Sequence, residues 1–159
     1  MNEKNLETIV NNIVGDAIVK EVMSLKLAVK LIETVEEKAT EMGLAVVAAV
    51  SDASGRPIAV HCMDGAYHGS FDVALNKTYT STAFQMSTAK LSRLCQPGQD
   101  LYGLQFSNNG KVMILGGGEP LMVGKTMIGA LGVSGGSAQE DSDLAAYGAS
   151  ALKEVIKCL

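Results

Sequence analysis

The chain has 159 residues and a mass of 16.6 kDa, which fits one domain of ordinary size. Hydrophobic residues make up 47% of the chain and charged residues 19%, so it is too apolar to remain disordered. The net charge of −4, the aromatic content of 4% and the dispersed lysines and arginines argue against a nucleic-acid-binding protein, which needs clustered positive charge and stacking aromatics.

Membrane, secretory and disulfide-framework classes are not indicated either. The longest uninterrupted apolar run, residues 44–50, is far shorter than the roughly 20 residues of a membrane-spanning helix. The polar, acidic N-terminus lacks the apolar core of a secretory signal. The three cysteines are odd in number and show no CxxC spacing, which argues against a disulfide framework or a cysteine-only zinc site. We therefore expect a cytoplasmic protein without a membrane segment.

The first 20 residues carry a helical amphipathic pattern. In residues 5–19, apolar side chains recur at the i, i+3, i+4 spacing of one helical face. They are Leu6, Ile9, Val10, Ile13, Val14, Ala17 and Ile18. Such a stripe packs either on the body of the same protein or on an external partner, and both alternatives remain open. We expect residues 1–20 to form an extension and residues 24–159 to form the domain.

A second helix is predicted to begin after Ser24 as its N-cap and to end at Gly43, in the left-handed conformation typical of a C-cap. Its expected inward residues are Leu25, Ala28, Val29, Ile32, Val35 and Ala39. Residues 44–50 and 57–63 then read as two strands of an antiparallel hairpin, because turn-forming residues 52–55 join them.

The segment 70–94 contains neither Pro nor Gly and predicts one long or broken helix, which Gln96-Pro97-Gly98 ends. A second hairpin is expected to pair residues 104–106 with 112–115 around Asn108-Asn109-Gly110, because these residues tolerate positive φ.

A third hairpin is expected to pair residues 121–123 with 127–133 through Gly124-Lys125. Ser137 and Glu140 form a capping-box pattern that begins a last helix, which extends to about residue 157. Short hairpin links dictate antiparallel pairing, so the order of elements predicts an α+β fold in which helices cover an antiparallel sheet.

The sequence matches two catalytic motifs only in part. Residues 118–126 resemble a phosphate-binding loop, but five residues separate the glycines where four are needed, and a strand pattern follows instead of a helix. Residues 132–136 match the G-x-S-x-G pattern of serine hydrolases around Ser134, but His61 and His68 precede this serine, whereas the hydrolase order places the histidine after it. Tight turning between strand and helix explains these glycines equally well.

The other residues that could bind a metal or cofactor lie close to His61 in the sequence. Strand alternation places His61 and Met63 on one face and Cys62 on the other, and imidazole, thioether and thiolate groups all ligate haem iron. Since no CxxCH pattern is present, any haem would be held without covalent attachment. Alternatively, His61, Asp64 and His68 could form a two-histidine, one-carboxylate metal site. A structural or surface histidine is also a common role.

Several ordered stretches resemble a known family. They are HCMDGA at 61–66, LNK at 75–77, QPGQDLYGLQFSN at 96–108, GGGEP at 116–120, and IGALGVSGG followed by QED at 139–141. These stretches resemble the HbpS/GlcG-like family, and most closely the C-terminal domain of the PduO-type propanediol-utilisation adenosyltransferase, over residues 24–157. The motif residues are Asp64, Gly65, Gly117, Gly118, Pro120, Ser134, Gly135, Glu140 and Asp141.

The resemblance implies a profilin-like α/β sandwich that assembles into homo-dimers or larger homo-oligomers and binds haem. It does not imply adenosyl transfer, which in the two-domain enzyme belongs to a separate helical domain. The cofactor-binding candidates are His61, His68, Cys62 and Lys77, with His61 or His68 as ligand of the haem iron. Cys62 replaces the family's usual Arg, so a positive charge for a haem propionate is lost there. Lys77 could meet a propionate or pair with a neighbouring Asp.

The first 20 residues also resemble the encapsulation peptides that dock on shell or cargo proteins of bacterial microcompartments. The leading hypothesis is therefore a non-catalytic haem-binding oligomer in the cytoplasm or in a microcompartment lumen. It would serve redox sensing, haem storage or the support of cobalamin-dependent diol metabolism. The alternative is a cofactor-free assembly module recruited through its N-terminal helix. A third possibility is a small-molecule enzyme that uses Asp64, Lys77 and Ser134.

Overall fold

The computed structural model describes residues 22–159, so the amphipathic helix expected in residues 5–19 lies outside the described residues. The helices are α2 (Leu25–Glu41), α3 (Ser70–Phe84), α4 (Thr88–Leu94) and α5 (Ala138–Lys157), with short 3₁₀ turns η1 (Leu104–Phe106) and η2 (Asn108–Gly110). The strands are β1 (Val47–Asp52), β2 (Pro57–Cys62), β3 (Gly118–Val123) and β4 (Thr126–Ser134).

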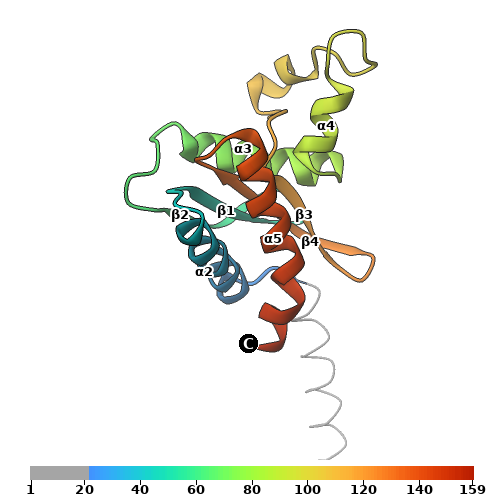
Figure 1. The fold of residues 1–159 in the computed structure, drawn as a ribbon. Helices are drawn as coiled ribbons and strands as arrows, with labels where there is room; N and C mark the ends of the chain where they lie inside the picture. The colour runs from blue at the N-terminus through green and yellow to red at the C-terminus, as the bar shows by residue number, and fades with distance from the viewer. Residues whose placement is uncertain (1–21) are drawn as a thin grey trace, which may run out of the picture.

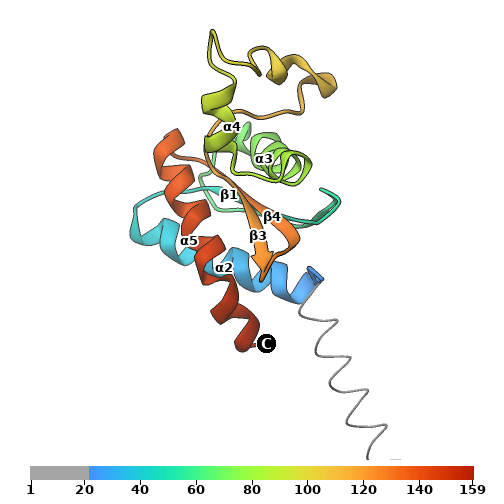
Figure 2. The ribbon, with the colours of Figure 1, turned by 90° about the vertical axis from the view of Figure 1, so that its right-hand side faces the viewer.

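The four strands form one antiparallel sheet in the order β2-β1-β4-β3. Helices α2 and α5 cover one face of this sheet and α3 covers the other (Figure 1, Figure 2). This arrangement confirms the predicted α+β sandwich. The β1–β2 and β3–β4 hairpins confirm two of the three predicted hairpins. Within residues 22–159, no helix combines the length and the apolar character needed to cross a membrane.

Helix α2 begins and ends where its capping residues predict. The Ser24 hydroxyl accepts a hydrogen bond from the Leu27 N–H at 3.2 Å, and Gly43 has φ +70°. The buried residues are Leu27, Ala28, Leu31, Ile32, Val35 and Ala39. The predicted inward position of Leu25 is wrong, because it is 63% exposed. The buried stripe passes through Leu27, and two residues turn a helix by about 200°, so Leu25 points away from the sheet.

The two faces of the sheet carry cores of unequal size. The large core joins α2, α5 and one face of the sheet, with Leu31, Leu131 and Leu144 fully buried at its centre. The face toward α3 buries only a small cluster of Val47, Ala49 and Ala74. Helix α3 lies close to β4 here, because a Cβ at Gly132 would collide with the Ala74 carbonyl oxygen.

The segment 70–94 is a broken helix, one of the two predicted forms. Gln85 adopts a left-handed conformation with φ +52°, which ends α3. The side chain of Ser87 then accepts a hydrogen bond from the Lys90 N–H and caps α4.

The predicted hairpin around Asn108-Asn109-Gly110 is wrong. These three residues do have positive φ, but they form a 3₁₀ turn, and residues 112–115 form no strand. The neighbouring apolar residues pack instead on α4, where Leu91, Cys95 and Val112 make a third buried cluster. The apolar side chains that a hairpin would have paired are therefore packed against α4 instead. The segment from α4 to residue 115 therefore forms a lobe that projects from the sandwich (Figure 1, Figure 2).

Candidate functional site

Most of the motif residues gather at one end of the sheet, where β2 and β4 end and β1 begins. Val47, the first residue of β1, pairs with Cys62 on one side and with Ser134 on the other. A Cβ on Gly65 would lie 3.9 Å from the Ala45 side chain, and a Cβ on Gly135 would lie 2.5 Å from the Ala45 carbonyl oxygen. Motifs separated by about 70 residues in the sequence therefore meet just before β1.

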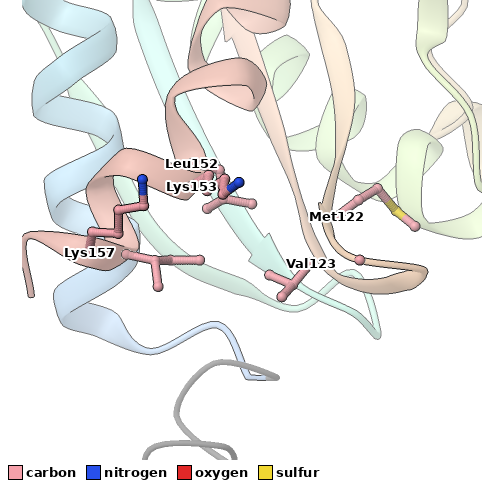
Figure 3. Close-up of a pocket in the computed structure, with 7 residues that line it drawn as sticks. Met122, Val123, Leu152, Lys153 and Lys157 are labelled. Atoms are coloured by element: carbon pink, nitrogen blue, oxygen red, sulfur yellow. The ribbon is translucent and has the colours of Figure 1, made fainter.

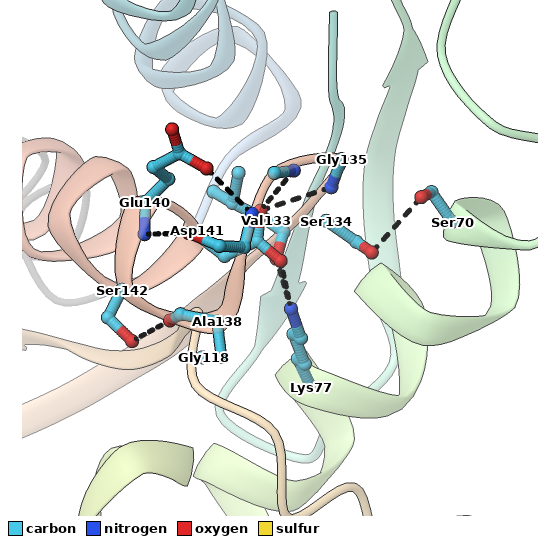
Figure 4. Close-up of polar contacts among 12 residues, drawn as sticks. Ser70, Lys77, Gly118, Val133, Ser134, Gly135, Ala138, Glu140, Asp141 and Ser142 are labelled. Carbon is cyan, nitrogen blue, oxygen red and sulfur yellow. Dashed lines mark hydrogen bonds and ion pairs between the residues drawn. The ribbon is translucent and has the colours of Figure 1, made fainter. Parts of the chain in front are cut away.

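A buried ion pair lies at the centre of this end. Lys77 of α3 is 1% exposed, and its Nζ donates to Asp141 Oδ2 and to the Val133 carbonyl oxygen, both at 2.7 Å. The other carboxylate oxygen, Asp141 Oδ1, accepts from the N–H groups of Gly135 at 3.1 Å and Gly136 at 2.9 Å (Figure 4). One carboxylate thus connects α3, the end of β4 and the first turn of α5.

The glycines of the GGGEP motif make room for this pair. Gly117 has φ +110°, and a Cβ there would lie 2.6 Å from the Val133 carbonyl oxygen and 2.8 Å from Lys77 Nζ. The next residue, Gly118, donates its N–H to Thr88 Oγ1 at 2.9 Å, which connects the start of β3 to α4. A side chain at position 117 would therefore displace the ammonium group or the strand.

Burial lowers the pKa of Lys77, while the hydrogen bond and the negative charge of Asp141 oppose this effect. Since the ammonium group is buried and engaged by Asp141 and Val133, it is not free to meet a haem propionate. Of the two roles considered for Lys77, the structure shows the pairing with an aspartate.

The serine and glutamate motif residues also have structural partners. Ser134 is 6% exposed, and its hydroxyl donates to the Ser70 hydroxyl at 3.1 Å rather than to either histidine. Glu140 accepts a hydrogen bond from the Ser137 N–H at 2.8 Å, and the Ser137 hydroxyl accepts one from the Glu140 N–H at 3.3 Å. This confirms the capping box. Hydrogen bonding of the Glu140 carboxylate by Ser137, mainly through the backbone N–H, lowers the pKa of Glu140. Pro120 lies apart, in the edge strand β3, where its missing N–H is tolerated.

His61 faces α2, on the side opposite to Cys62. It pairs with Ala48, which belongs to the α2–α5 core, whereas Cys62 pairs with Val47 on the α3 side. Met63 also packs against the α2–α5 core, so the predicted alternation of the three side chains is confirmed. His61 Nδ1 lies 3.2 Å from Glu36 Oε1, and because a carboxylate only accepts, the ring donates its Nδ1–H.

The histidines do not converge. His68 and Asp64 are exposed in the loop that precedes α3, and Cys62 is exposed at the end of β2. Within residues 22–159, no cluster of three or more His, Cys, Asp or Glu side chains is arranged to hold a metal ion. The alternative of a two-histidine, one-carboxylate site made by His61, Asp64 and His68 is therefore wrong.

One residue of this site was missed from the sequence. Glu36 lies at the edge of the buried stripe of α2, one turn from Ile32 and Ala39, and 25 residues separate it from His61. No local spacing signals such a contact, since it depends on how α2 lies across β2.

Comparison with known families decides the relationship. The model of the family described as "Haem degrading protein HbpS-like" matches residues 23–150, which is most of the chain. The chain belongs to this HbpS-like family. An uncharacterized 15.0 kDa protein from the dhaT-dhaS intergenic region of Citrobacter freundii is 40% identical over 123 residues, covering 77% of this chain and 87% of that protein.

Two other relatives of this HbpS-like chain have informative names. The crystal structure of a PduOC:haem complex superimposes with a TM-score of 0.78 at 35% identity, over 82% of this chain and 94% of that chain. The corrinoid adenosyltransferase PduO of Salmonella typhimurium is 38% identical over 109 residues, covering 69% of this chain. The match spans 32% of PduO, about a third of its length.

Proposed function

We propose that this HbpS-like chain binds haem without covalent attachment and acts as a non-catalytic accessory protein. The observation that carries the proposal is its similarity to the PduOC:haem complex, at 35% identity and a TM-score of 0.78 over 94% of that chain. The match to PduO covers only a third of that enzyme, so adenosyl transfer is not part of the proposal.

His61 has the surroundings of an iron ligand. Glu36 accepts its Nδ1–H, and in the neutral ring this places the lone pair on Nε2. Histidines that bind metals usually have such a carboxylate partner on the second ring nitrogen. The side chain is 34% exposed, so part of the ring is open to a ligand from outside the chain. The ring therefore fits haem ligation from the edge strand β2.

His68 is the second candidate, for a different reason. It is exposed and stands between Tyr67, which is 74% exposed, and the first turn of α3, where Phe71 is 43% exposed. Exposed aromatic side chains beside an imidazole offer apolar contact to a flat macrocycle. Cys62, exposed near the same loop, is a third candidate ligand.

The proposed homo-oligomer is supported by the projecting lobe. Four of its large apolar side chains are exposed: Leu94 at 37%, Tyr102 at 61%, Phe106 at 80% and Leu115 at 50%. Exposed apolar patches of this kind mark protein–protein contacts. We propose that a second copy of the chain covers the lobe. In light scattering, Phe106→Glu should lower the oligomeric mass, whereas Met42→Glu, at an exposed apolar position outside the lobe, should leave it unchanged.

Titration with haemin tests the cofactor. Wild type should develop a Soret band distinct from that of free haemin, and His61→Ala should shift this band or weaken binding at least tenfold. His68→Ala and Cys62→Ala are the matched comparisons, because loss of binding in either variant would identify that residue as the ligand of the haem iron. A wild-type spectrum identical to that of free haemin would reject haem binding. Loss of the Soret band under oxygen and ascorbate would instead indicate haem degradation, the activity in the family's description.

The second proposed function is a cofactor-free assembly module. It rests on the apolar stripe of residues 5–19 and their resemblance to encapsulation peptides. This proposal includes association with a bacterial microcompartment in the cytoplasm. The protein would lie in the lumen of the microcompartment and dock on shell or cargo proteins. The name PduO supports a link only to corrinoid metabolism. Deletion of residues 1–20 should abolish co-sedimentation with microcompartments while haemin binding remains; unchanged co-sedimentation would reject the recruiting role.

A further inference from the structure

A cavity of about 400 Å³ lies between the C-terminal half of α5 and the β3–β4 hairpin, far along the chain from both histidines. Its apolar lining consists of Met122 and Val123 from the hairpin and Leu152 and Ile156 from α5. Two lysines of α5, Lys153 and Lys157, line the same cavity (Figure 3). A cavity with an apolar lining and two basic groups would fit a segment that has one apolar side and acidic residues next to it.

The chain enters the described structure beside this cavity. Met23 is 3% exposed and belongs to the core cluster that contains Leu152, and the cavity-lining residues Val123 and Ile156 pack against the same cluster. The preceding residue, Val22, is 55% exposed. Residues 1–21 therefore join the described chain next to a residue that shares a hydrophobic cluster with the walls of the cavity.

The composition of residues 1–21 complements the cavity. The segment carries the seven-residue apolar stripe between positions 6 and 18, and four carboxylates against two lysines, so its net charge is −2. Lys153 forms no ion pair within residues 22–159, while Lys157 pairs with Glu154 at 2.7 Å on the exposed surface. An acidic segment would find one uncompensated ammonium group at the cavity.

We propose that the apolar side of residues 6–18 docks into this cavity of its own chain. Residues 19–21 span about 10 Å when extended, which is enough to turn the segment back along α5. The docked segment would cover Met122, which is now 45% exposed, and would shield its own apolar stripe from partners. Recruitment through residues 1–20 would then require a partner that competes with the cavity. This inference does not depend on haem binding.

The absence of tryptophan from the chain allows a direct test. Ile13→Trp places the only indole in the middle of the apolar stripe, and Asn12→Trp places it about 100° away, among the polar residues of the expected helix. Docking predicts blue-shifted emission and several-fold weaker acrylamide quenching for Ile13→Trp than for Asn12→Trp. Equal emission and equal quenching for the two variants would overturn the proposal.

Changes in the cavity identify the docking site. Adding Met122→Glu or Lys153→Glu to Ile13→Trp should shift the emission to the red, and both positions are exposed, so the fold should tolerate them. Protection of the indole that survives both changes would place the segment elsewhere and refute the proposal. Protection that disappears on dilution to nanomolar protein would mean docking on a second copy, which also contradicts docking within one chain.

Discussion

Lys77 and Asp141 are 64 residues apart in the sequence, lie on helices that cover opposite faces of the sheet, and meet at 2.7 Å in the interior. Both side chains are almost completely buried, at 1% and 5% exposure. The motif glycines Gly117 and Gly135 surround them, so much of the family motif serves to build this pair rather than to present a reactive group.

Asp141→Asn should lower the free energy of unfolding by about 3–5 kcal/mol, because it leaves the buried Lys77 ammonium without a counter-charge. Lys77→Met should cost less, since Asp141 keeps two backbone N–H donors. Urea denaturation measures both changes. Glu33→Gln breaks the exposed Lys30–Glu33 pair and should change the free energy of unfolding far less, because solvent screens this pair. Similar losses for Asp141→Asn and Glu33→Gln would contradict a central structural role for the buried pair.

Gly117→Ala should prevent folding or cost several kcal/mol, because the new Cβ would meet the Val133 carbonyl oxygen at 2.6 Å at a residue with φ +110°. Gly98→Ala is the matched control, since Gly98 also has positive φ but nothing lies within 4 Å of a Cβ there. It should cost only about 1–2 kcal/mol of left-handed strain. Thermal unfolding followed by circular dichroism compares the two variants; equal shifts in Tm would rule out crowding at Gly117.

Glu119 of β3 is half-buried and its pKa is raised by burial. A raised carboxyl pKa in the folded state contributes stability below the unfolded value of 4.5, and this contribution is lost as the pH rises through the folded pKa. Glu119→Gln should therefore stabilise the protein at pH 7, because it removes the cost of burying the charge, and this advantage should disappear below pH 4.5.

Urea denaturation at several pH values between 4 and 7 measures this dependence. Glu37→Gln, at an exposed position of α2, is the control and should give no pH-dependent gain. A gain from Glu119→Gln that is independent of pH would show that burial of the charge is not its cause.

Ser137→Ala should lower the free energy of unfolding by about 1 kcal/mol, because it removes the side-chain acceptor that caps α5. The N–H of residue 137 still holds Glu140, so part of the capping box remains. Ser150→Ala, at an exposed serine inside α5, is the comparison and should be nearly neutral. An equal loss for both variants would show that capping does not limit stability.

The sequence identified the haem-ligand candidates by their residue types. It did not predict how these side chains are arranged in space. Strand alternation correctly separated His61 and Met63 from Cys62, because side-chain direction in a strand depends only on neighbouring residues. The partner of His61 could not be predicted, since Glu36 reaches it from another element. The cavity beside α5 was not predicted either, because it is formed by two elements about 30 residues apart.

By itself, the sequence determined the features that depend on contacts within about four residues. Local patterns predicted the Ser24 and Ser137 caps, the left-handed Gly43 and the turn at Gly124, since capping and turn bonds close within one helical turn. The sequence also placed these elements in the right order for an antiparallel sandwich.

Tertiary structure decided the rest. The Asn108-Asn109-Gly110 segment has the backbone angles of a turn, but packing of its neighbours on α4 prevented a hairpin. The Lys77–Asp141 pair and the Glu36–His61 contact exist only because the sheet brings distant helices and strands together. Burial of a charged pair is a property of the assembled core, and no short segment of the chain specifies it.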